Sequence, residues 1–202
     1  MILGLAGGIA SGKTEVAEVF QKLGAVIISG DQLGREVVEK DQRVRARLVK
    51  TFGREILNSD GSLNRRKLGL LAFSTPVYRK KLNWIVHPPL LRLLRQRVAQ
   101  LRRQNPKRPI VIDAALLVEW KNPVKLDKLI VVYAPRKVRS VRLKRKGLTL
   151  SEIRDRMRSQ VPFSVERRCA DIIVRNSGTL TALRRHTREI WFELTATRRG
   201  RV

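Results

Sequence analysis

Residues 7–14 read Gly7-Gly8-Ile9-Ala10-Ser11-Gly12-Lys13-Thr14. A short apolar run, residues 2–6, leads into them, and a run with apolar residues at helical spacing follows up to Leu23. The pattern Gly-x-x-x-x-Gly-Lys-Thr between a strand and a helix is typical of a loop that binds nucleotide phosphates. Its glycines let the backbone N–H groups turn toward phosphate oxygens, and the next helix adds the positive end of its dipole.

The residues of this loop have distinct expected roles. Lys13 supplies a point charge for the β- and γ-phosphates, and the Thr14 hydroxyl is placed to ligate Mg²⁺. We therefore predict a site for a nucleoside triphosphate and Mg²⁺ that comprises Gly7, Gly8, Ile9, Ala10, Ser11, Gly12, Lys13, Thr14 and Glu15. The alternative is a glycine-rich turn with a chance lysine, which the flanking strand and helix patterns disfavour.

Five short apolar runs have the composition of buried parallel strands. They cover residues 2–6, 25–29, 109–113, 129–133 and 171–174. Helical patterns alternate with them, which predicts an α/β fold of the P-loop NTPase type. In this fold a five-stranded parallel sheet carries helices on both faces.

We expect one domain of 202 residues. Its core covers about residues 1–40, 109–135 and 170–194. The long helical stretch at 41–108 interrupts the strand–helix rhythm and indicates an inserted lobe for an acceptor substrate. Within that stretch we expect breaks near Gly53, Asp60-Gly61 and Pro88-Pro89.

The second half of the chain has strongly basic helical patterns. Those at 136–146 and 150–160 predict a basic helical lid over about 136–168. The last helix is expected from about residue 180 to 194, followed by a frayed basic tail at 195–202.

The charge of the chain is strongly positive and unevenly distributed. There are 44 Lys and Arg, 30 of them Arg, against 17 Asp and Glu, which gives a net charge of +27. Residues 1–39 carry a net charge of −2, residues 40–112 carry +16 and the remainder carries +13. This surplus indicates either a surface for a polyanion such as RNA or a solvated helix surface. Aromatic residues are only 5% of the chain and avoid the basic runs, so we do not favour nucleic-acid binding as the main function.

Several kinds of protein are excluded by composition. A single cysteine, Cys169, excludes an internal disulfide framework and a multi-cysteine zinc site, and two histidines leave no His cluster. No apolar run approaches the roughly 18 residues of a membrane span. The apolar start has no basic region before it, unlike a signal peptide. We expect a soluble, cytoplasmic protein, and the sequence leaves its oligomeric state open.

Asp31 follows the second predicted strand and favours a small kinase. At the carboxyl edge of a parallel sheet a carboxylate faces the phosphates, where it can accept the proton of an acceptor hydroxyl. An equal alternative is that Asp31 caps a helix that begins near Gln32. No Asn-Lys-x-Asp sequence follows, which disfavours a GTPase.

Beyond the loop, separated motifs resemble the dephospho-CoA kinase family over roughly residues 2–194. They are the loop at 7–14, Asp31 with Arg35-Glu36, Phe52-Gly53, Leu63-Asn64-Arg65, residues 82–88 (Leu-Asn-Trp-Ile-Val-His-Pro), Leu116-Leu117-Val118-Glu119, Gln160, Ala170-Asp171 and Asn176-Ser177-Gly178. The resemblance implies transfer of the γ-phosphoryl group of ATP to the ribose 3′-hydroxyl of dephospho-CoA. The products are CoA and ADP, and this is the last step of CoA synthesis.

The resemblance also implies catalytic and ATP-binding roles. Asp31 falls on the family's catalytic base and acts with Lys13. Arg142 falls on an arginine that closes over the nucleotide as part of the lid, and Asn176 on the loop beside the adenine.

Three further residues fall on acceptor-binding positions, namely Arg65, His87 and Glu119. The residues by themselves allow other interpretations for two of them. His87 before Pro88 also suits a packed residue at a helix end, and Glu119 also suits a cap or the ion-pair partner of an arginine.

Three positions depart from the family's pattern. Ser29 stands where the family usually has the first carboxylate of Asp-Ala-Asp, Glu166 where it has a lysine, and Arg139 where it has Gln or a similar residue. Arg167 is available to replace the lysine charge. Three other functions stay open: another small-molecule or nucleotide kinase, an RNA-associated NTPase, and a protein that binds nucleotide without turnover.

Overall fold

The computed structural model describes residues 1–120 and 123–199 of the chain. The chain folds into two compact units. The first comprises Met1–Ser29 together with Leu101–Val202, and the second is Gly30–Gln100.

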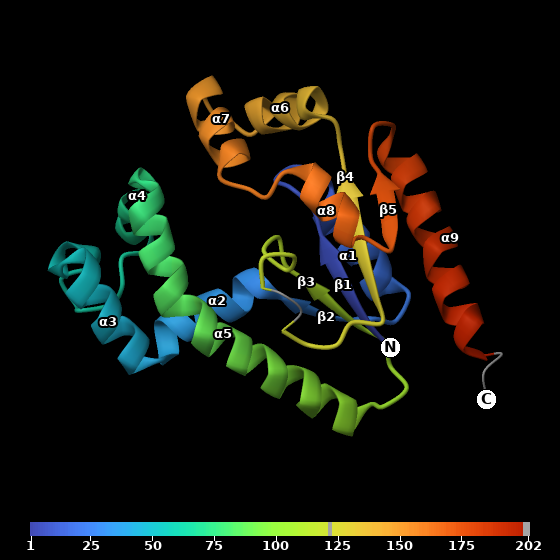
Figure 1. The fold of residues 1–202 in the computed structure, drawn as a ribbon, viewed down its shortest axis with the longest axis horizontal. Coiled ribbons are helices and arrows are strands. Elements are labelled where there is room, and N and C mark those ends of the chain that lie inside the picture. The colour runs from blue at the N-terminus through green and yellow to red at the C-terminus, as the bar shows by residue number, and fades with distance from the viewer. Residues whose placement is uncertain (121–122, 200–202) are drawn as a thin grey trace. The chain divides into compact units, whose positions relative to one another are not determined.

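A parallel sheet forms the centre of the first unit (Figure 1). Its strands within the described residues are β1 (Ile2–Ala6), β2 (Val26–Ser29), β3 (Ile110–Asp113), β4 (Lys128–Tyr133) and β5 (Ile172–Arg175). They lie in the order β2-β3-β1-β4-β5, and every neighbouring pair is parallel. Each predicted apolar run matches a strand to within one residue, because strands covered on both faces are almost continuously apolar.

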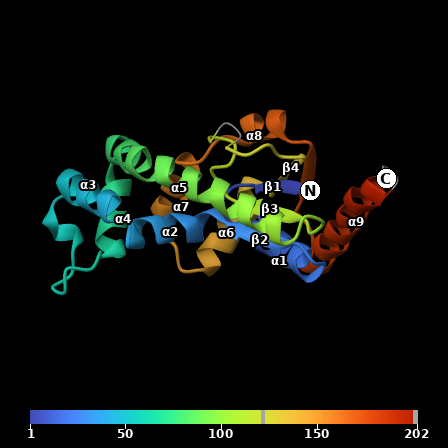
Figure 2. The same cartoon turned by 90° about the horizontal axis from the view of Figure 1, so that it is seen from below.

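Helices cover both faces of this sheet, as predicted. Helices α1 (Lys13–Lys22) and α9 (Leu180–Arg199) pack against each other on one face, and α8 (Phe163–Cys169) lies on the other, as Figure 2 shows. Leu5 and Ile130 of the sheet share the core with Phe20 of α1 and Trp191 of α9. The Phe20 and Trp191 rings lie 5.3 Å apart between centroids. This contact joins the first helix of the chain to the last.

Two basic helices follow β4, as predicted: α6 (Arg136–Arg145) and α7 (Leu150–Arg158). A reciprocal cap begins α7, in which the Thr149 and Glu152 side chains each bind the backbone N–H of the other. Thr149 and Glu152 therefore fix where the helix starts. That these helices and α8 act as a lid stays a prediction.

The end of α9 corrects the expectation of a frayed tail from residue 195. The helix continues to Arg199, and residues 200–202 lie outside the described residues. Ile190 and Trp191 are buried against the core, and the Thr195 hydroxyl donates a hydrogen bond to the Trp191 carbonyl at 2.8 Å. The helix therefore extends past residue 194, where we expected it to end.

The second unit is helical. It contains α2 (Gly30–Lys40), α3 (Gln42–Phe52), the 3₁₀ turn η1 (Arg54–Ile56), α4 (Arg65–Ser74) and most of α5 (Pro76–Gln104). Asp41 caps the N-terminus of α3, and Gly53 ends that helix with a φ of 85°, so the predicted break near Gly53 is confirmed. The unit begins at Gly30 and ends at Gln100, whereas the lobe that we predict covers 41–108. Its role towards an acceptor stays a prediction.

The prolines at 88 and 89 do not break α5, contrary to our expectation. Proline lacks an N–H group, but its φ near −65° is helical, so a helix continues where packing compensates for the lost hydrogen bonds. Ile85, Leu90 and Leu94 are buried on this helix on both sides of the prolines. Neither α5 nor another helix in the described part of the chain is long and apolar enough to cross a membrane.

Candidate active site

The loop at 7–14 joins β1 to α1, as predicted, through a tightly turned backbone. Gly12 is the N-cap of α1 with a φ of 100°, and Ala10 also has a left-handed φ, of 60°. A Cβ atom at Gly12 would collide with the amide group of Asn176. Both the backbone angle and the close approach of Asn176 therefore require glycine at this position.

Lys13 forms an ion pair with Asp113, the last residue of β3. The two side chains are only 18% and 15% exposed. Asp113 pairs in register with Leu5 of β1 and Ser29 of β2, so it lies at the carboxyl edge of the sheet. Our sequence analysis did not identify Asp113 as a site residue. The pattern Ile-Val-Ile-Asp, an apolar strand followed by a carboxylate, could have indicated it. The Asp113 carboxylate therefore lies next to position 29, where Ser29 has a hydroxyl and no carboxylate.

The oxygen groups at this edge suit a magnesium ion. Mg²⁺ prefers carboxylate, hydroxyl and phosphate oxygens, and Asp113 and Thr14 supply a carboxylate and a hydroxyl. Thr14 is exposed in the first turn of α1. Glu15, the next residue, is engaged by Arg184 of α9 at 3.0 Å, an ion pair that ties α1 to α9.

A guanidinium and an amide from distant elements hold the loop. Arg142 of α6 donates to the Ala10 carbonyl at 3.1 Å and to the Asn176 Oδ1 atom at 3.0 Å. Asn176 follows β5, is 5% exposed and donates to the Ser11 carbonyl at 2.7 Å. The structure thus brings together Arg142, Asn176 and the loop, which the sequence had placed in one site.

A second guanidinium, from Arg139 of α6, also binds the loop. Its Nε atom donates to the Ile9 carbonyl at 2.8 Å, and its Nη2 atom donates to the Gln160 Oε1 atom at 2.9 Å. Glu166 of α8 is buried at 5% exposure, and this burial raises the pKa of its carboxyl to about 7 against the opposing effect of Arg139. The sequence pattern marked Arg139 and Glu166 as departures and gave no sign that their charges interact.

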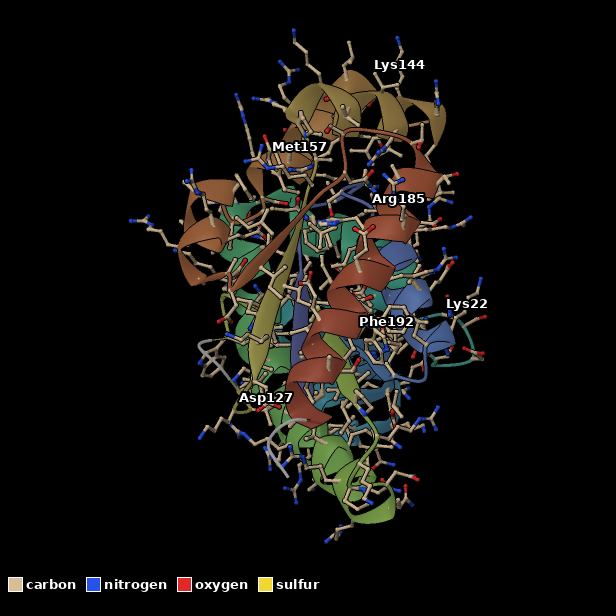
Figure 3. All side chains as sticks on the ribbon, turned by 90° about the vertical axis from the view of Figure 1, so that its right-hand side faces the viewer. Lys22, Asp127, Lys144, Met157, Arg185 and Phe192 are labelled. Carbon is tan, nitrogen blue, oxygen red and sulfur yellow. The ribbon has the colours of Figure 1, made fainter. Side chains whose placement is uncertain are left out.

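A cleft of about 300 Å³ opens beside Asn176. Its wall is formed by the loop after β5 and by α9, including Gly178, Arg185 and His186. Figure 3 shows Arg185 on the upper part of α9, below helices α6 and α7, which carry Lys144 and Met157. The cleft adjoins the loop through Asn176, which donates a hydrogen bond to the Ser11 carbonyl.

The residues predicted for the acceptor lie on other elements. Asp31 is exposed in the first turn of α2, and because that helix begins at Gly30, Asp31 is not its N-cap. Arg65 is the first residue of α4 and forms an ion pair with Glu39. His87 is half-buried inside α5 rather than at a helix end, and burial lowers the pKa of its imidazole.

The predicted site residues are divided between the two units. Asp31, Arg65 and His87 belong to the helical unit, and the residues of the loop belong to the unit with the sheet. Glu119 is exposed in the turn that follows β3, also in the unit with the sheet.

Comparison with known proteins identifies the family of this chain. The family model of dephospho-CoA kinase matches residues 1–182. The dephospho-CoA kinase of Geobacter sulfurreducens is 38% identical over 192 residues, which cover 94% of this chain and 96% of that protein. The dephospho-CoA kinase of Moorella thermoacetica is 39% identical over 194 residues, which cover 96% of this chain and 92% of that protein.

Solved structures share the fold of this chain. The protein TT1252 from Thermus thermophilus is similar with a TM-score of 0.77 at 31% identity, over 96% of this chain and 97% of that one. The dephospho-CoA kinase from Campylobacter jejuni has a TM-score of 0.65 at 21% identity, over 95% and 96% of the two chains. A shikimate kinase from Acinetobacter baumannii shares the fold, with a TM-score of 0.53 at 14% identity over 97% of this chain and 93% of that one. This chain therefore belongs to the dephospho-CoA kinase family.

Proposed function

We propose that this chain transfers the γ-phosphoryl group of ATP to the ribose 3′-hydroxyl of dephospho-CoA. The proposal is carried by one observation: a complete phosphate loop, with Lys13 and Asp113 paired beneath it, in a member of this family. The products are CoA and ADP.

The donor nucleotide binds at the loop. Lys13 exchanges its contact with Asp113 for the β- and γ-phosphates, because they carry more negative charge than one carboxylate. Bound Mg²⁺ would neutralise phosphate charge, with Thr14 and Asp113 as its ligands from this chain. The adenine lies in the cleft beside Asn176, whose contact with Arg142 supports this assignment.

The transfer step makes one bond and breaks one. The 3′-oxygen of the acceptor bonds to the γ-phosphorus while the bond from that phosphorus to the β,γ-bridging oxygen breaks. The electron pair of the broken bond leaves with ADP, and the hydroxyl proton passes to the Asp31 carboxylate. Lys13 and Arg142 stabilise the negative charge that develops, and positioned bases of this kind contribute about 10²- to 10⁴-fold.

Three residues are proposed to bind the acceptor. The Arg65 guanidinium has the planar geometry that binds phosphate oxygens in pairs, which suits the diphosphate of dephospho-CoA. Burial lowers the pKa of His87, which favours the neutral ring, and in the neutral ring one nitrogen can accept a hydrogen bond. Glu119 supplies an exposed carboxylate for a hydroxyl group of the acceptor.

The test is to measure ADP release from Mg·ATP with dephospho-CoA, with CoA and with no acceptor. We expect ADP only with dephospho-CoA, together with a product that is heavier by one phosphoryl group. CoA is the matched control because its 3′-oxygen already carries a phosphate. ADP release that does not depend on dephospho-CoA would contradict the proposal.

The net charge of +27 supports one competing candidate, an RNA-associated NTPase. This candidate predicts ADP release that RNA stimulates and that falls steeply as salt is added. Adding RNA to the same assay at two salt concentrations separates the two functions. Dephospho-CoA kinase activity unaffected by RNA would exclude this candidate.

A further inference from the structure

Both backbone polar groups of Ile9 in the phosphate loop are held by side chains. Its N–H donates to the Gln160 Oε1 atom at 2.8 Å, and its carbonyl accepts from the Arg139 Nε atom at 2.8 Å. The Arg139 Nη2 atom also donates to the Gln160 Oε1 atom, at 2.9 Å. One amide oxygen, from Gln160, thus accepts hydrogen bonds from a loop N–H and from a guanidinium together.

The guanidinium of Arg139 lies directly against the loop. A Cβ atom placed on Gly8 would be 2.7–2.8 Å from its Nη2, Cζ and Nη1 atoms. With glycine at position 8 the guanidinium reaches the loop with no shift of the Arg139 side chain. A cation at this place adds to the positive potential that loop N–H groups offer to phosphates.

The charge of Arg139 is incompletely balanced within the protein. Burial lowers the pKa of its guanidinium, Arg136 of the same helix lowers it further, and Glu166 and Tyr133 raise it. The Glu166 carboxyl, with its pKa raised to about 7 by burial, carries only part of a negative charge near neutral pH. Arg139 is half-buried, and a partly desolvated cation without a full counter-charge is stabilised when an anion binds beside it.

We propose that Arg139 binds a phosphate oxygen of the donor nucleotide, and that the Gln160 amide oxygen holds that place when no nucleotide is bound. The proposal rests on the proposed ATP-dependent function and adds two residues to its donor site. A phosphate oxygen accepts the same two hydrogen bonds as Gln160 and also carries negative charge, so it adds Coulomb attraction to the Arg139 cation that a neutral amide oxygen lacks. ATP therefore displaces Gln160, and Arg139 stays as a phosphate ligand.

Binding of Mg·ATP and of inorganic tripolyphosphate, measured by calorimetry without acceptor, tests the proposal. We expect Arg139→Gln to weaken both by about 10- to 100-fold, the usual effect of losing a hydrogen bond to a charged group. Gln160→Ala removes only the competitor, so its affinity should equal or exceed that of the unchanged protein. A merely structural role for the Ile9 contacts predicts that both variants weaken binding, and that result would overturn the proposal.

Two further variants make the result specific. Arg145→Gln removes the same charge from an exposed position of α6, and we expect it to have little effect. Arg139→Lys keeps the charge and should recover part of the lost affinity, which also guards against a folding defect in Arg139→Gln. Equal affinities of Arg139→Gln and Arg145→Gln would overturn the role of Arg139. If the unchanged protein does not bind Mg·ATP, the proposed function itself fails, and with it this inference.

Discussion

The phosphate loop and the helical unit Gly30–Gln100 hold their predicted site residues in different ways. At the loop, Lys13, Arg142 and Asn176 are buried or half-buried, and each contacts a residue that lies far away in the sequence. In the helical unit, Asp31 is exposed, and Arg65 makes an ion pair whose two side chains are 49% and 45% exposed. The residues predicted for the donor nucleotide are thus held by contacts within the chain, whereas Asp31 and Arg65, predicted for the acceptor side, lie partly or fully exposed to solvent.

This difference has an energetic consequence. An exposed ion pair such as Arg65 with Glu39 contributes about 0–1 kcal/mol to stability, because water and salt screen it. Contacts around the loop are shielded and depend on one another, so their loss costs more. Substitutions at the loop should therefore change nucleotide binding, and substitutions in the helical unit should change turnover or acceptor binding alone.

The largest effect is expected at Lys13. Lys13→Ala removes the cation that neutralises the transferred group, so turnover should fall by about three orders of magnitude or more. Lys22→Ala is the matched control, because Lys22 is exposed at the other end of α1 (Figure 3). Dephospho-CoA-dependent ADP release measures both variants. Near-normal turnover in Lys13→Ala would show that the donor side is not centred on this loop.

Asp31→Asn tests whether the two regions divide binding from chemistry. The amide keeps the shape of the side chain but is a very poor base, so kcat should fall by about 10²- to 10⁴-fold. The affinity for Mg·ATP should not change. Steady-state kinetics together with calorimetric binding check both parts. An unchanged kcat would remove Asp31 from the catalytic role, and a loss of ATP affinity would break the division between the regions.

Local patterns predicted the strands and the loop, because a buried parallel strand and a phosphate loop each have a sequence signature of their own. The same reasoning failed at Pro88, where packing outweighed a local preference, and at the end of α9, which lies beyond the predicted residue 194. Glu166 shows a further limit: a charged residue in a basic segment is expected at the surface, yet it is buried. Its surroundings come from residues distant in the sequence, and no spacing in the sequence encodes them.

The site was predictable to a similar extent. Arg142 and Asn176 meet at the loop as the resemblance implied, whereas the contacts of Arg139 with Gln160 needed the fold. The acceptor roles of Arg65 and His87 stay predictions. Steady-state kinetics of Arg65→Ala tests the role of Arg65. We expect the KM for dephospho-CoA to rise and the KM for ATP to stay unchanged.

The stability of the unit that contains the sheet should depend on the contact between α1 and α9. Trp191→Ala removes a buried ring that packs on Phe20, and such truncations cost about 3–5 kcal/mol in the free energy of unfolding. The neighbouring Phe192 is 59% exposed on the same helix (Figure 3), so Phe192→Ala is the matched control and should cost far less. Urea unfolding measures both. Equal losses would show that α9 is not part of the core that supports the loop.

The smallest of these effects concerns Glu166 and the pH dependence of stability. Burial raises the pKa of Glu166 from 4.5 to about 7 in the folded chain. Between these two values the folded chain keeps a proton that the unfolded chain releases, so the free energy of unfolding falls as the pH rises and then levels off. Glu166→Gln has no carboxyl to titrate, so its free energy of unfolding should not fall in this way. The difference in this free energy, variant minus unchanged protein, should rise by about 1–3 kcal/mol between about pH 5 and pH 8.

Glu152 provides a control of opposite sign for this measurement. Its hydrogen bonds with Thr149 lower the pKa of its carboxyl, so its contribution to stability is present above its unfolded pKa and is lost as the pH falls. In Glu152→Gln the stability relative to the unchanged protein should therefore be lowest at neutral pH and should recover in acid. Urea unfolding of the two variants from about pH 3 to about pH 8 covers both transitions, with the Glu152 effect in the acidic part and the Glu166 effect between the two values of its pKa. A Glu166→Gln variant that follows the unchanged protein at every pH would mean that this carboxylate ionises freely, and the charge of Arg139 beside the loop would then already be balanced without a nucleotide.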